Sequence, residues 1–493
     1  MHAKLNLEGR KALVVGLGDT GLSCVRWLLS QGAEVRATDS REAPPHAERL
    51  REAQPGVAVT LAGFRQVDFD WADLIVVSPG VAVATPEIQA AAKAGKDIVG
   101  DVELFARAVQ GSRPEGTPRP PFILAERGLP QAGEGRGEGN RGPGPKVIAI
   151  TGSNGKSTVT SLVGHLCQAA GLKTVVAGNI GLPVLDALTE QGDARPDVYV
   201  LELSSFQLET TSSLAPDAAT VLNLSEDHMD RYAGMADYAA AKARIFAGAG
   251  AQVLNRDDAL VLAMRLPGRT IYSFGLGEPV AAGEWGLIRQ DGRYWLAEHG
   301  RSLMPVDELP IAGLHNAANA LAALALCRAV GIDDAPLLAG LKTFKGLPHR
   351  VEAVATIKGV TFYDDSKGTN VGATVAALLG MTCPVVLIAG GDGKGQDFSP
   401  LKDAVKNARA VVQIGRDGPR IAAAIAGTVP VQRAESLEAA VRQGFTLARP
   451  GDAVLLSPAC ASFDMFRNYV HRAEVFIQAV QALKTEEEGV HVL

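Results

Sequence analysis

The chain has 493 residues, more than a single hydrophobic core accommodates, so we expect several domains. Its formal net charge is −6 and no long block of Lys and Arg stands out, which argues against general nucleic-acid binding, because that affinity comes from clustered cations. With 47% hydrophobic and 21% charged residues, the composition is that of a soluble globular protein.

The cysteines and the apolar segments indicate the compartment. Five cysteines lie far apart without a Cys-x-x-Cys pair, so neither a zinc site nor a disulfide framework is indicated. The first residues lack the basic start and long apolar middle of a signal peptide. Apolar runs such as 320–327 fall well short of the roughly 20 residues that span a bilayer. We therefore expect a cytoplasmic protein without membrane insertion.

The pattern along the chain predicts an α/β protein. Short β-branched or leucine-rich runs alternate with Ala- and Leu-rich helical stretches, which is typical of parallel sheets joined by crossover helices. Gly, Pro, Arg and Glu dominate between Gly111 and Pro145, which indicates a solvated linker or insertion. A weaker boundary falls near 345–349, where Gly346 and Pro348 interrupt the helical pattern. We predict domains at 1–110, 146–346 and 347–493, with 111–145 between the first two.

A first glycine loop, Gly16-Leu17-Gly18-Asp19-Thr20-Gly21, follows a predicted strand at 12–15, and Asp39 ends the next predicted strand at 34–38. This context fits the dinucleotide fingerprint, in which glycines let the backbone approach a pyrophosphate and the following helix offers unpaired N–H groups. Such a loop recognises a diphosphate, and a UDP-linked ligand would use it as well as NAD. A turn that only packs helix on strand is the alternative, so the ligand stays open.

A second glycine loop follows the predicted strand at 146–150 and precedes a predicted helix at 159–170. Its sequence is Thr151-Gly152-Ser153-Asn154-Gly155-Lys156-Ser157-Thr158, and it departs from the usual phosphate-loop spacing because Ile150 stands where the first glycine is expected. Backbone N–H groups can still cradle phosphate, Lys156 can reach the β- and γ-oxygens, and Ser157 or Thr158 can bind Mg²⁺. We interpret this loop as an ATP site.

Phosphoryl transfer needs the negative charge of the phosphates to be neutralised, usually by Mg²⁺. Two candidate Mg²⁺ ligands follow at the ends of later predicted strands. Glu202 directly follows a predicted strand at 198–201 and stands between apolar residues, a costly place for an unpaired carboxylate. His228 follows the predicted strand at 219–222, amid Glu226, Asp227 and Asp230, which we interpret as solvated or helix-capping rather than catalytic. A surface Glu and an isolated His remain the alternatives.

Taken together, these motifs resemble the Mur ligase family, which also includes folylpolyglutamate synthases. The resemblance implies three α/β domains: a Rossmann-like N-terminal domain for a uridine nucleotide, a P-loop central ATPase domain and a Rossmann-like C-terminal domain for an amino acid. It implies an ATP-dependent, ADP-forming ligase that joins D-glutamate to UDP-N-acetylmuramoyl-L-alanine through an acyl phosphate. Such an enzyme serves peptidoglycan synthesis, and with it cell shape and division. The segments that carry the resemblance are 151–158, 201–207, 225–232, 346–350, 364–370, 390–394 and 456–464.

The resemblance also implies which residues meet each ligand. For the UDP-linked substrate these are Gly18, Asp19, Thr20, Asp39, Ser40, Gly80, Asn179 and Ser204. For ATP they are Gly152, Ser153, Asn154, Gly155, Lys156, Ser157, Thr158, Asn319, Arg350 and Asp365. For D-glutamate they are Lys367, Thr369, Lys394, Ser462 and Phe463. The catalytic set would be Lys156, Glu202, His228, Lys242 and Arg350, with two Mg²⁺ ions held by Ser157, Glu202, His228 and Lys242.

Some of these roles rest on the resemblance alone. A lysine in an alanine-rich helix, such as Lys242, normally keeps its head in water, whereas the resemblance implies a carbamylated side chain, which is an anion suited to a second Mg²⁺. Similarly, Lys367 and Lys394 could lie in glycine-rich surface loops. The insertion at 111–145 departs from the family, where this connection is short. We expect a monomer.

Two other functions stay open. A ligase of the same chemistry could use another amino acid or a folate, although the first glycine loop argues against folate. A protein of a different class, a non-catalytic sensor, could bind NAD at the Gly16 loop and ATP at the Gly152 loop. Turnover with an amino-acid panel and titration with NAD(H) would separate these alternatives.

Overall fold

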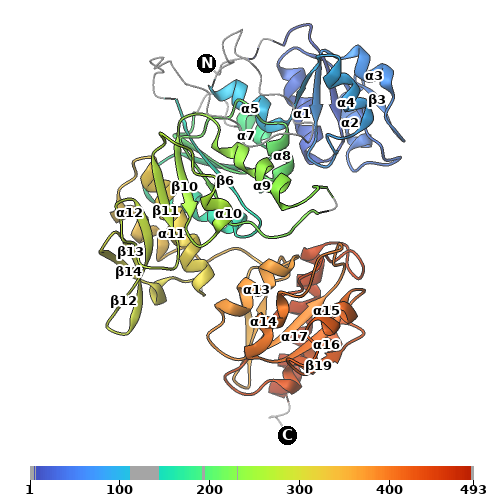
Figure 1. The fold of residues 1–493 in the computed structure, drawn as a ribbon. Helices are drawn as coiled ribbons and strands as arrows, with labels where there is room; N and C mark the ends of the chain where they lie inside the picture. Colours follow the sequence, from blue (N-terminus) through green and yellow to red (C-terminus); the bar gives the residue numbers. More distant parts are fainter. Residues whose placement is uncertain are drawn as a thin grey trace.

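The computed structural model of the protein describes residues 5, 7–110, 144–190, 195–229, 231–311 and 313–489. Nearly all of the insertion predicted at 111–145 therefore lies outside the described residues, as does Asp230. Within them, the strands form three sheets with helices packed against them, and Figure 1 shows these as three units that follow one another along the chain. This is the three-domain α/β fold that the sequence predicts.

The N-terminal unit is built on a parallel sheet with the strand order β3-β2-β1-β4-β5. β1 and β4 are neighbours although β2 and β3 come between them in the chain, so the order reverses there and the loops after β1 and β4 flank a crevice. The strands are β1 (Lys11–Val15), β2 (Glu34–Thr38), β3 (Ala58–Thr60), β4 (Leu74–Val77) and β5 (Asp97–Val99). The helices are α1 (Asp19–Ser30), α2 (Ala47–Ala53), α3 (Gln66–Trp71), α4 (Pro86–Lys93) and α5 (Asp101–Gln110).

The central unit has the strand order β14-β13-β12-β11-β10-β9-β6-β8-β7. β6 pairs in parallel with both β9 and β8, so the loops after these three strands leave the same edge of the sheet. The strands are β6 (Lys146–Thr151), β7 (Thr174–Gly178), β8 (Val198–Glu202), β9 (Ala218–Val221), β10 (Ala251–Asn255), β11 (Ile271–Phe274), β12 (Glu284–Gln290), β13 (Arg293–Glu298) and β14 (Arg301–Pro305). The helices are α6 (Lys156–Ala169), α7 (Val184–Glu190), α8 (Ser205–Glu209), α9 (Met235–Ala243), η1 (Arg244–Phe246), α10 (Ala259–Leu262), η2 (Val306–Glu308), α11 (Leu314–Ala329) and α12 (Asp334–Leu341).

The C-terminal unit has the strand order β15-β16-β20-β17-β18-β19, with β15 antiparallel to β16. β16, β20 and β17 are parallel neighbours, so their carboxyl ends also share one edge. The strands are β15 (Glu352–Ile357), β16 (Val360–Asp364), β17 (Val385–Gly390), β18 (Ala408–Ile414), β19 (Val431–Arg433) and β20 (Ala453–Leu456). The helices are α13 (Val371–Gly380), α14 (Leu401–Ala404), η3 (Val405–Asn407), α15 (Gly418–Ala424), α16 (Leu437–Leu447) and α17 (Tyr469–Gly489).

The N-terminal and central units share one hydrophobic core. Helix α5 packs against α7, and the rings of Phe105 and Tyr199 meet edge to face with centroids 5.1 Å apart. Glu103 adds polar contacts across this interface by accepting the backbone N–H groups of Ser212 and Ser213 at 2.7 and 2.8 Å. The C-terminal unit, in contrast, is organised around its own apolar clusters and follows the connection 342–351.

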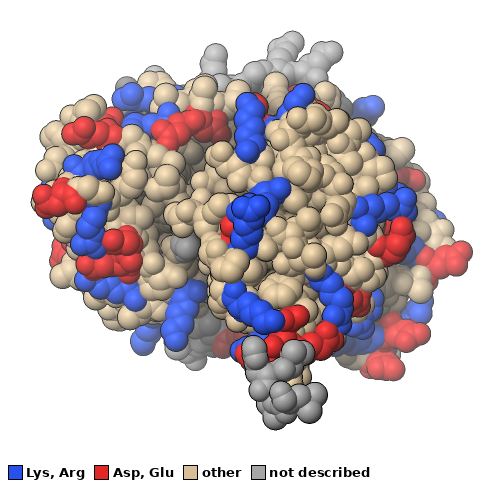
Figure 2. All heavy atoms as spheres, turned by 90° about the horizontal axis from the view of Figure 1, so that it is seen from below, with Lys and Arg blue, Asp and Glu red and all other residues tan. Residues whose placement is uncertain are grey.

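On the molecular surface, charges of both signs are mixed. Figure 2 views the molecule from the side of its C-terminal end, where basic and acidic side chains are interspersed rather than gathered into a field of one sign. Among the helices in the described ranges, none is long and apolar enough to cross a membrane.

The first glycine loop yields a test of this fold, because a Cβ atom on Gly21 would lie 1.8 Å from the Gly16 carbonyl oxygen. We expect Gly21→Ala to lower the free energy of unfolding by roughly 2 kcal/mol or more, since a clash with backbone forces the loop and helix α1 apart. Gly18→Ala is the matched control, because a Cβ atom there meets nothing within 4 Å. Denaturant unfolding followed by tryptophan fluorescence measures both, and equal midpoints would contradict the loop geometry.

Candidate active site

The first glycine loop connects β1 to α1 and is tied to its neighbouring strands. The backbone N–H of Leu17 donates to Asp39 Oδ2 at 2.7 Å, and Ser78 Oγ donates to the Gly16 carbonyl at 2.8 Å. Arg41 donates from Nε and Nη2 to the two oxygens of Asp39 at 3.0 and 2.8 Å. Burial alone would raise the pKa of Asp39, but these hydrogen bonds from Arg41 and Leu17 lower it. Asp39, which follows β2, is thus an anion paired with Arg41.

The residues predicted for the UDP-linked substrate are divided between the N-terminal and central units. Gly18 and Thr20 lie at the start of α1, while Asp19 faces His46 at 2.6 Å. Ser40 and Gly80 are exposed in the connections after β2 and β4, whereas Asn179 and Ser204 come from the central unit. Arg41 was not predicted from the sequence, because an arginine beside a strand end carries no local signal until its guanidinium is seen on Asp39.

The second glycine loop lies between β6 and α6. Ile150 belongs to β6, so the loop begins only after Thr151, which explains why the first glycine of the common pattern is missing. Gly152 and Gly155 have φ values of 154° and 81°, and a Cβ atom on Gly152 would lie 3.0 Å from the Leu222 Cβ. Glycine is therefore required at both positions by backbone conformation or by space.

Two buried amines meet at one carbonyl of this loop. The Gly152 oxygen accepts from Lys156 Nζ at 2.8 Å and from Lys242 Nζ at 2.9 Å. Burial, together with the neighbouring cation, lowers the pKa of Lys242 well below its ordinary value, and burial also lowers the pKa of Lys156. Lys242 is only 1% exposed, so the interpretation of this lysine as a solvated helix residue is wrong. Two positive charges this close in a buried site require anions nearby.

Glu202, at the end of β8, is one such anion. It is 1% exposed, and its Oε1 accepts from Asn179 Nδ2 at 2.8 Å. Its Oε2 is buried and has no hydrogen-bond partner among the described residues. An orphan carboxylate oxygen beside a phosphate loop fits a divalent cation, because carboxylate and hydroxyl oxygens are the ligands that Mg²⁺ prefers. The buried hydroxyl of Ser157 at the start of α6 completes a donor set of this kind.

His228 follows β9 in a left-handed conformation, with φ at 57°. Its ring meets Phe206 edge to face at 4.8 Å, and its Nε2 lies 3.5 Å from Asp227 Oδ2. Glu226 is exposed, as expected for a solvated residue. Asp227, for which the same interpretation was made, has a side chain only 13% exposed and faces the C-terminal unit, with Lys394 Nζ at 3.8 Å.

The C-terminal unit approaches the phosphate loop along several contacts. Asn370 Nδ2 donates to Asn154 Oδ1 at 3.1 Å and lies 3.5 Å from Asp227 Oδ2. Arg350 Nη2 donates to Ser157 Oγ at 3.4 Å, and the buried Nε of Arg350 has no partner among the described residues. The charge of Arg350 therefore sits at the loop where an arginine finger would act.

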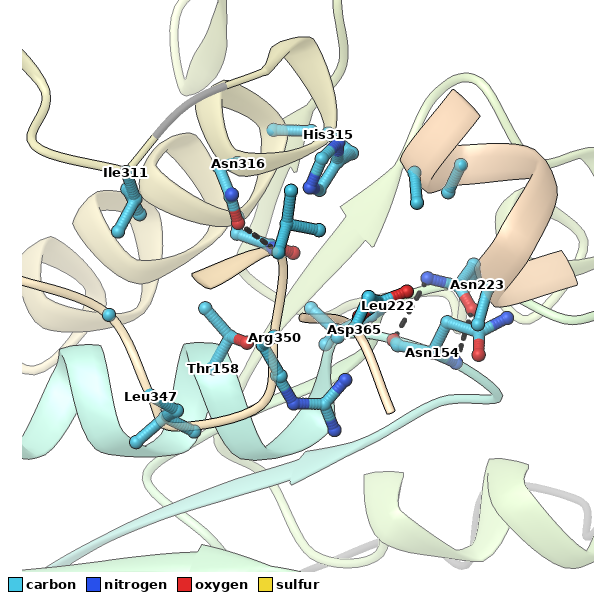
Figure 3. A pocket seen from close by; sticks show the side chains of 18 of the residues that line it. Asn154, Thr158, Leu222, Asn223, Ile311, His315, Asn316, Leu347, Arg350 and Asp365 are labelled. Carbon is cyan, nitrogen blue, oxygen red and sulfur yellow. Dashed lines mark hydrogen bonds between the residues drawn. The ribbon is translucent and has the colours of Figure 1, made fainter. Parts of the chain in front are cut away.

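A pocket opens beside these residues, between the start of α11 and the loops of both units (Figure 3). Figure 3 shows His315 and Asn316 on one side of the pocket, with Arg350, Asp365 and the phosphate-loop residue Asn154 on the other. Asn319 also lines the pocket, along with Thr158 and Asn223. Burial, reinforced by Arg350, lowers the pKa of His315 to about 4, so its ring is neutral at pH 7. Neutral polar groups and apolar walls of this kind suit a nucleobase.

The residues predicted to bind the amino acid substrate belong to the C-terminal unit. Lys367 follows β16 and is half-buried, with Nζ 5.2 Å from the centre of the Tyr469 ring. Ser462, which follows β20, is 2% exposed. Burial and the nearby Arg350 lower the pKa of Lys367. Lys394 follows β17, so three neighbouring strand ends supply this group.

The structure thus brings together most, but not all, of the predicted site. Lys156, Glu202, Lys242 and Arg350 converge at the phosphate loop: the two amines share the Gly152 carbonyl, Arg350 donates to Ser157, and the charge of Glu202 acts on the pKa of both lysines. Thr369 lies in the same loop as Lys367, whose carbonyl accepts its backbone N–H at 2.9 Å. Phe463, by contrast, is 74% exposed and is not enclosed with the others. Asp227 and Asn370 were missed as functional residues, because only the packing of two units places them face to face.

Family models and curated relatives agree with this arrangement of a phosphate-loop unit between two Rossmann-like units. The chain matches the Mur ligase MurD-like N-terminal domain over residues 10–100, the Mur ligase middle domain over 150–327 and the glutamate ligase domain over 349–460. These matches cover most of the sequence, and the chain belongs to the Mur ligase family.

Individual proteins extend the likeness over the whole length. The chain is 59% identical to the UDP-N-acetylmuramoylalanine--D-glutamate ligase of Thiobacillus denitrificans over 99% of both chains. It is 57% identical to the enzyme of that name from Methylobacillus flagellatus, over 98% of this chain and 99% of that one. Among solved structures, the ligase MurC of Thermotoga maritima superimposes with a TM-score of 0.56 at 19% identity, over 96% of this chain and 100% of the other.

Asp365 allows a prediction about stability in the absence of ligands. Burial raises the pKa of Asp365 to about 7, although a hydrogen bond from Ser457 and the charge of Arg350 oppose the shift. The folded protein therefore holds this proton over a pH range in which the unfolded chain has lost it. The contribution of Asp365 to stability should fall as pH rises from about 4 to about 7, by at most about 4 kcal/mol, and stay level above that.

Unfolding of the wild type and of Asp365→Asn across this pH range measures the effect, which is expected to disappear in the variant. Asp403→Asn, on the surface of the same unit, is the control, with a small change of opposite sign because Lys406 lowers the pKa of Asp403. Parallel pH profiles for wild type and Asp365→Asn would contradict the raised pKa.

Proposed function

We propose that the chain is an ATP-dependent ligase that adds D-glutamate to UDP-N-acetylmuramoyl-L-alanine. One observation carries most of this proposal: the cations of Lys156, Arg350 and Lys367 gather where the loops of the central and C-terminal units face each other. Three cations at one buried place suit a reaction between a triphosphate and two carboxylate-bearing substrates. Membership of the Mur ligase family and the names of the curated relatives support the same substrates.

In the proposed reaction, a carboxylate oxygen of the UDP-linked substrate attacks the γ-phosphorus of ATP, and the bond to the bridging oxygen of ADP breaks. The amine of D-glutamate, after losing a proton, then attacks the acyl carbon, and inorganic phosphate leaves as the amide forms. Lys156 and Arg350 would neutralise the charge of the transferred phosphoryl group. Lys367 and Lys394 would hold the carboxylates of D-glutamate from the opposite side.

Magnesium is the cation this site would bind, through Glu202, His228 and the Ser157 hydroxyl. Bound there, it supplies neutralisation of phosphate charge. We propose that the site binds two Mg²⁺ ions. A second ion needs a further anionic ligand, and one of the two buried amines would have to become that anion.

That anion would be a carbamate on Lys242. The neutral amine adds to the carbon of CO₂, a C–N bond forms and one proton is released, which leaves a carboxylate on the side chain. Two features favour this: Lys242 is only 1% exposed with a lowered pKa, and its amine shares a carbonyl acceptor with Lys156. Carbamylation would place an anion beside the Lys156 cation, so that the two groups attract each other.

The three units would divide the substrates. We propose that residues 1–110 bind the uridine diphosphate at the Gly16 loop, that 146–346 bind ATP, and that 347–493 bind D-glutamate. The protein would act as a monomer in the cytoplasm, where ATP and nucleotide-linked sugars are available.

Release of phosphate tests the function directly. With ATP and UDP-N-acetylmuramoyl-L-alanine present, D-glutamate should support turnover, whereas L-glutamate, L-lysine and a folate should not. Lys156→Ala should reduce turnover by at least about 10²-fold, because it removes charge stabilisation from the phosphoryl group, while the UDP-linked substrate still binds. A non-catalytic sensor that binds NAD at the Gly16 loop would instead show saturable NAD(H) binding without turnover. Equal rates with another amino acid would overturn the proposed specificity.

The carbamate is tested by ¹³C NMR of protein equilibrated with ¹³C-bicarbonate. We expect a carbamate resonance in the wild type and in Lys156→Ala, which serves as a matched control because it removes the other amine. Lys242→Ala should lack the resonance and lose at least about 10²-fold in turnover. Full activity of Lys242→Ala, or an unchanged spectrum, would rule the carbamate out.

A further inference from the structure

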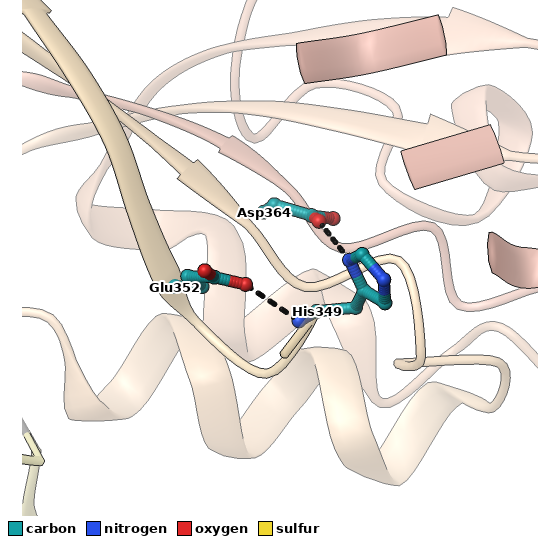
Figure 4. A group of neighbouring side chains, drawn as sticks. All are labelled: His349, Glu352 and Asp364. Atoms are coloured by element: carbon teal, nitrogen blue, oxygen red, sulfur yellow. Dashed lines mark hydrogen bonds and ion pairs between the residues drawn. The ribbon is translucent and has the colours of Figure 1, made fainter. Parts of the chain in front are cut away.

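The connection between the central and C-terminal units carries a side-chain cluster that the proposed reaction does not yet use. It consists of His349, Glu352 and Asp364, which Figure 4 shows turned toward one another. His349 Nδ1 lies 2.7 Å from Asp364 Oδ2, and the backbone N–H of His349 donates to Glu352 Oε2 at 2.9 Å. The Asp364 side chain is 0% exposed and the His349 side chain 18%. The ring of His349 is therefore held by Asp364 at the end of β16, while its backbone N–H is held by Glu352 at the start of β15.

The hydrogen bonds in this cluster make it an anchor for the main chain. Its ligand-type atoms all lie within 4.8 Å of one another, but each carboxylate already accepts a hydrogen bond from the protein. Asp364 Oδ1 accepts the backbone N–H of Ser366 at 2.9 Å while Oδ2 meets the His349 ring. Both ends of the Asp364 carboxylate thus fix backbone segments, one before β15 and one after β16.

The anchored segment has an unusual conformation. His349 and Val351, on either side of Arg350, have φ values of 63° and 49°. Left-handed φ is uncommon for residues other than glycine and is a clear outlier for a β-branched residue such as Val351. Conformations of this kind persist only where the surroundings hold them in place. The direction in which Arg350 leaves the backbone therefore depends on the anchor beside it.

His349 also contacts the loop of Lys367, which is proposed to bind the amino acid. The backbone N–H of Lys367 donates to the His349 carbonyl at 3.3 Å. On its other side, the neighbouring Arg350 reaches Ser157 at 3.4 Å. His349 thus directly precedes the residue whose guanidinium reaches the phosphate loop, and its own carbonyl contacts the loop of Lys367.

We propose that His349 is a positioning residue for the ligase reaction. Through its contact with Asp364, it fixes Arg350 at the phosphate loop in register with the loop of Lys367. This inference rests on the proposed function, because it concerns the alignment of the phosphoryl group with the amino acid. Losing the anchor should change the rate more than the affinities, since a displacement of about 1 Å in a reacting group can cost about 10²-fold in rate.

Three substitutions separate the ring contact from the backbone. His349→Gly removes the ring but allows the left-handed φ without strain. His349→Asn keeps a side-chain donor and also tolerates this conformation. His299→Gly is the matched control, because His299 also has a positive φ, of 33°, but is exposed in the turn between β13 and β14. Each variant is assayed as full-length protein for kcat, for the Kd of ADP and of the UDP-linked substrate, and for its thermal midpoint.

We expect His349→Gly to lower kcat by about 10²-fold while both Kd values change by less than about threefold. His349→Asn should recover at least about tenfold of that loss, and His299→Gly should match the wild type. Should His349→Gly fail the thermal check, Asp364→Ala carries the same test with the same expected fall in kcat. Equal losses in the Gly and Asn variants, or kcat of His349→Gly within about twofold of wild type, would overturn the positioning role. A wild-type chain without D-glutamate-dependent turnover would overturn the proposed function itself.

Discussion

The convergence of two buried amines on the Gly152 carbonyl is the constraint on which the site depends. Lys156 and Lys242 cannot both stay charged at this spacing without anions, because burial weakens their hydration and each disfavours the other's charge. The nearby anions, Glu202 and Asp227, offset this only in part, since burial still outweighs them in both amines. The glycine loop at 151–158 therefore favours binding of a phosphate anion, which its backbone N–H groups also attract.

Sheet topology explains how residues far apart in the chain meet at this loop. β8, β6 and β9 are parallel neighbours, so Glu202, the phosphate loop and the Asp227 segment leave one edge of the central sheet. The C-terminal sheet repeats the arrangement with β16, β20 and β17, from which Asp365, Ser462 and Lys394 follow. Placing two such edges face to face creates a site that neither unit contains alone. Asp227 and Asn370 bridge it, and His349 lies at the connection between the two.

Much of this could be predicted from the sequence where a local pattern has one physical meaning. Strand, glycine loop and helix identify a phosphate site, and a carboxylate among apolar residues at a strand end, such as Glu202, is costly unless it has a partner. Lys242 could not be found in this way, because its burial depends on the packing of α9 against the phosphate loop. Asp227 was interpreted as a solvated or capping residue for the same reason: its partners Lys394 and Asn370 are distant in sequence. Likewise, the direction of the Arg350 side chain depends on the left-handed conformations of its two neighbours, which the sequence does not reveal.

In the proposed reaction, ATP activates the carboxylate of the UDP-linked substrate by transferring its γ-phosphoryl group. This step is tested most directly with substrate whose alanyl carboxylate carries ¹⁸O. With both carboxylate oxygens labelled, the oxygen that attacks phosphorus later leaves with phosphate, so each turnover should place one ¹⁸O atom in inorganic phosphate, which mass spectrometry detects. Unlabelled phosphate, formed together with the amide product, would contradict the account.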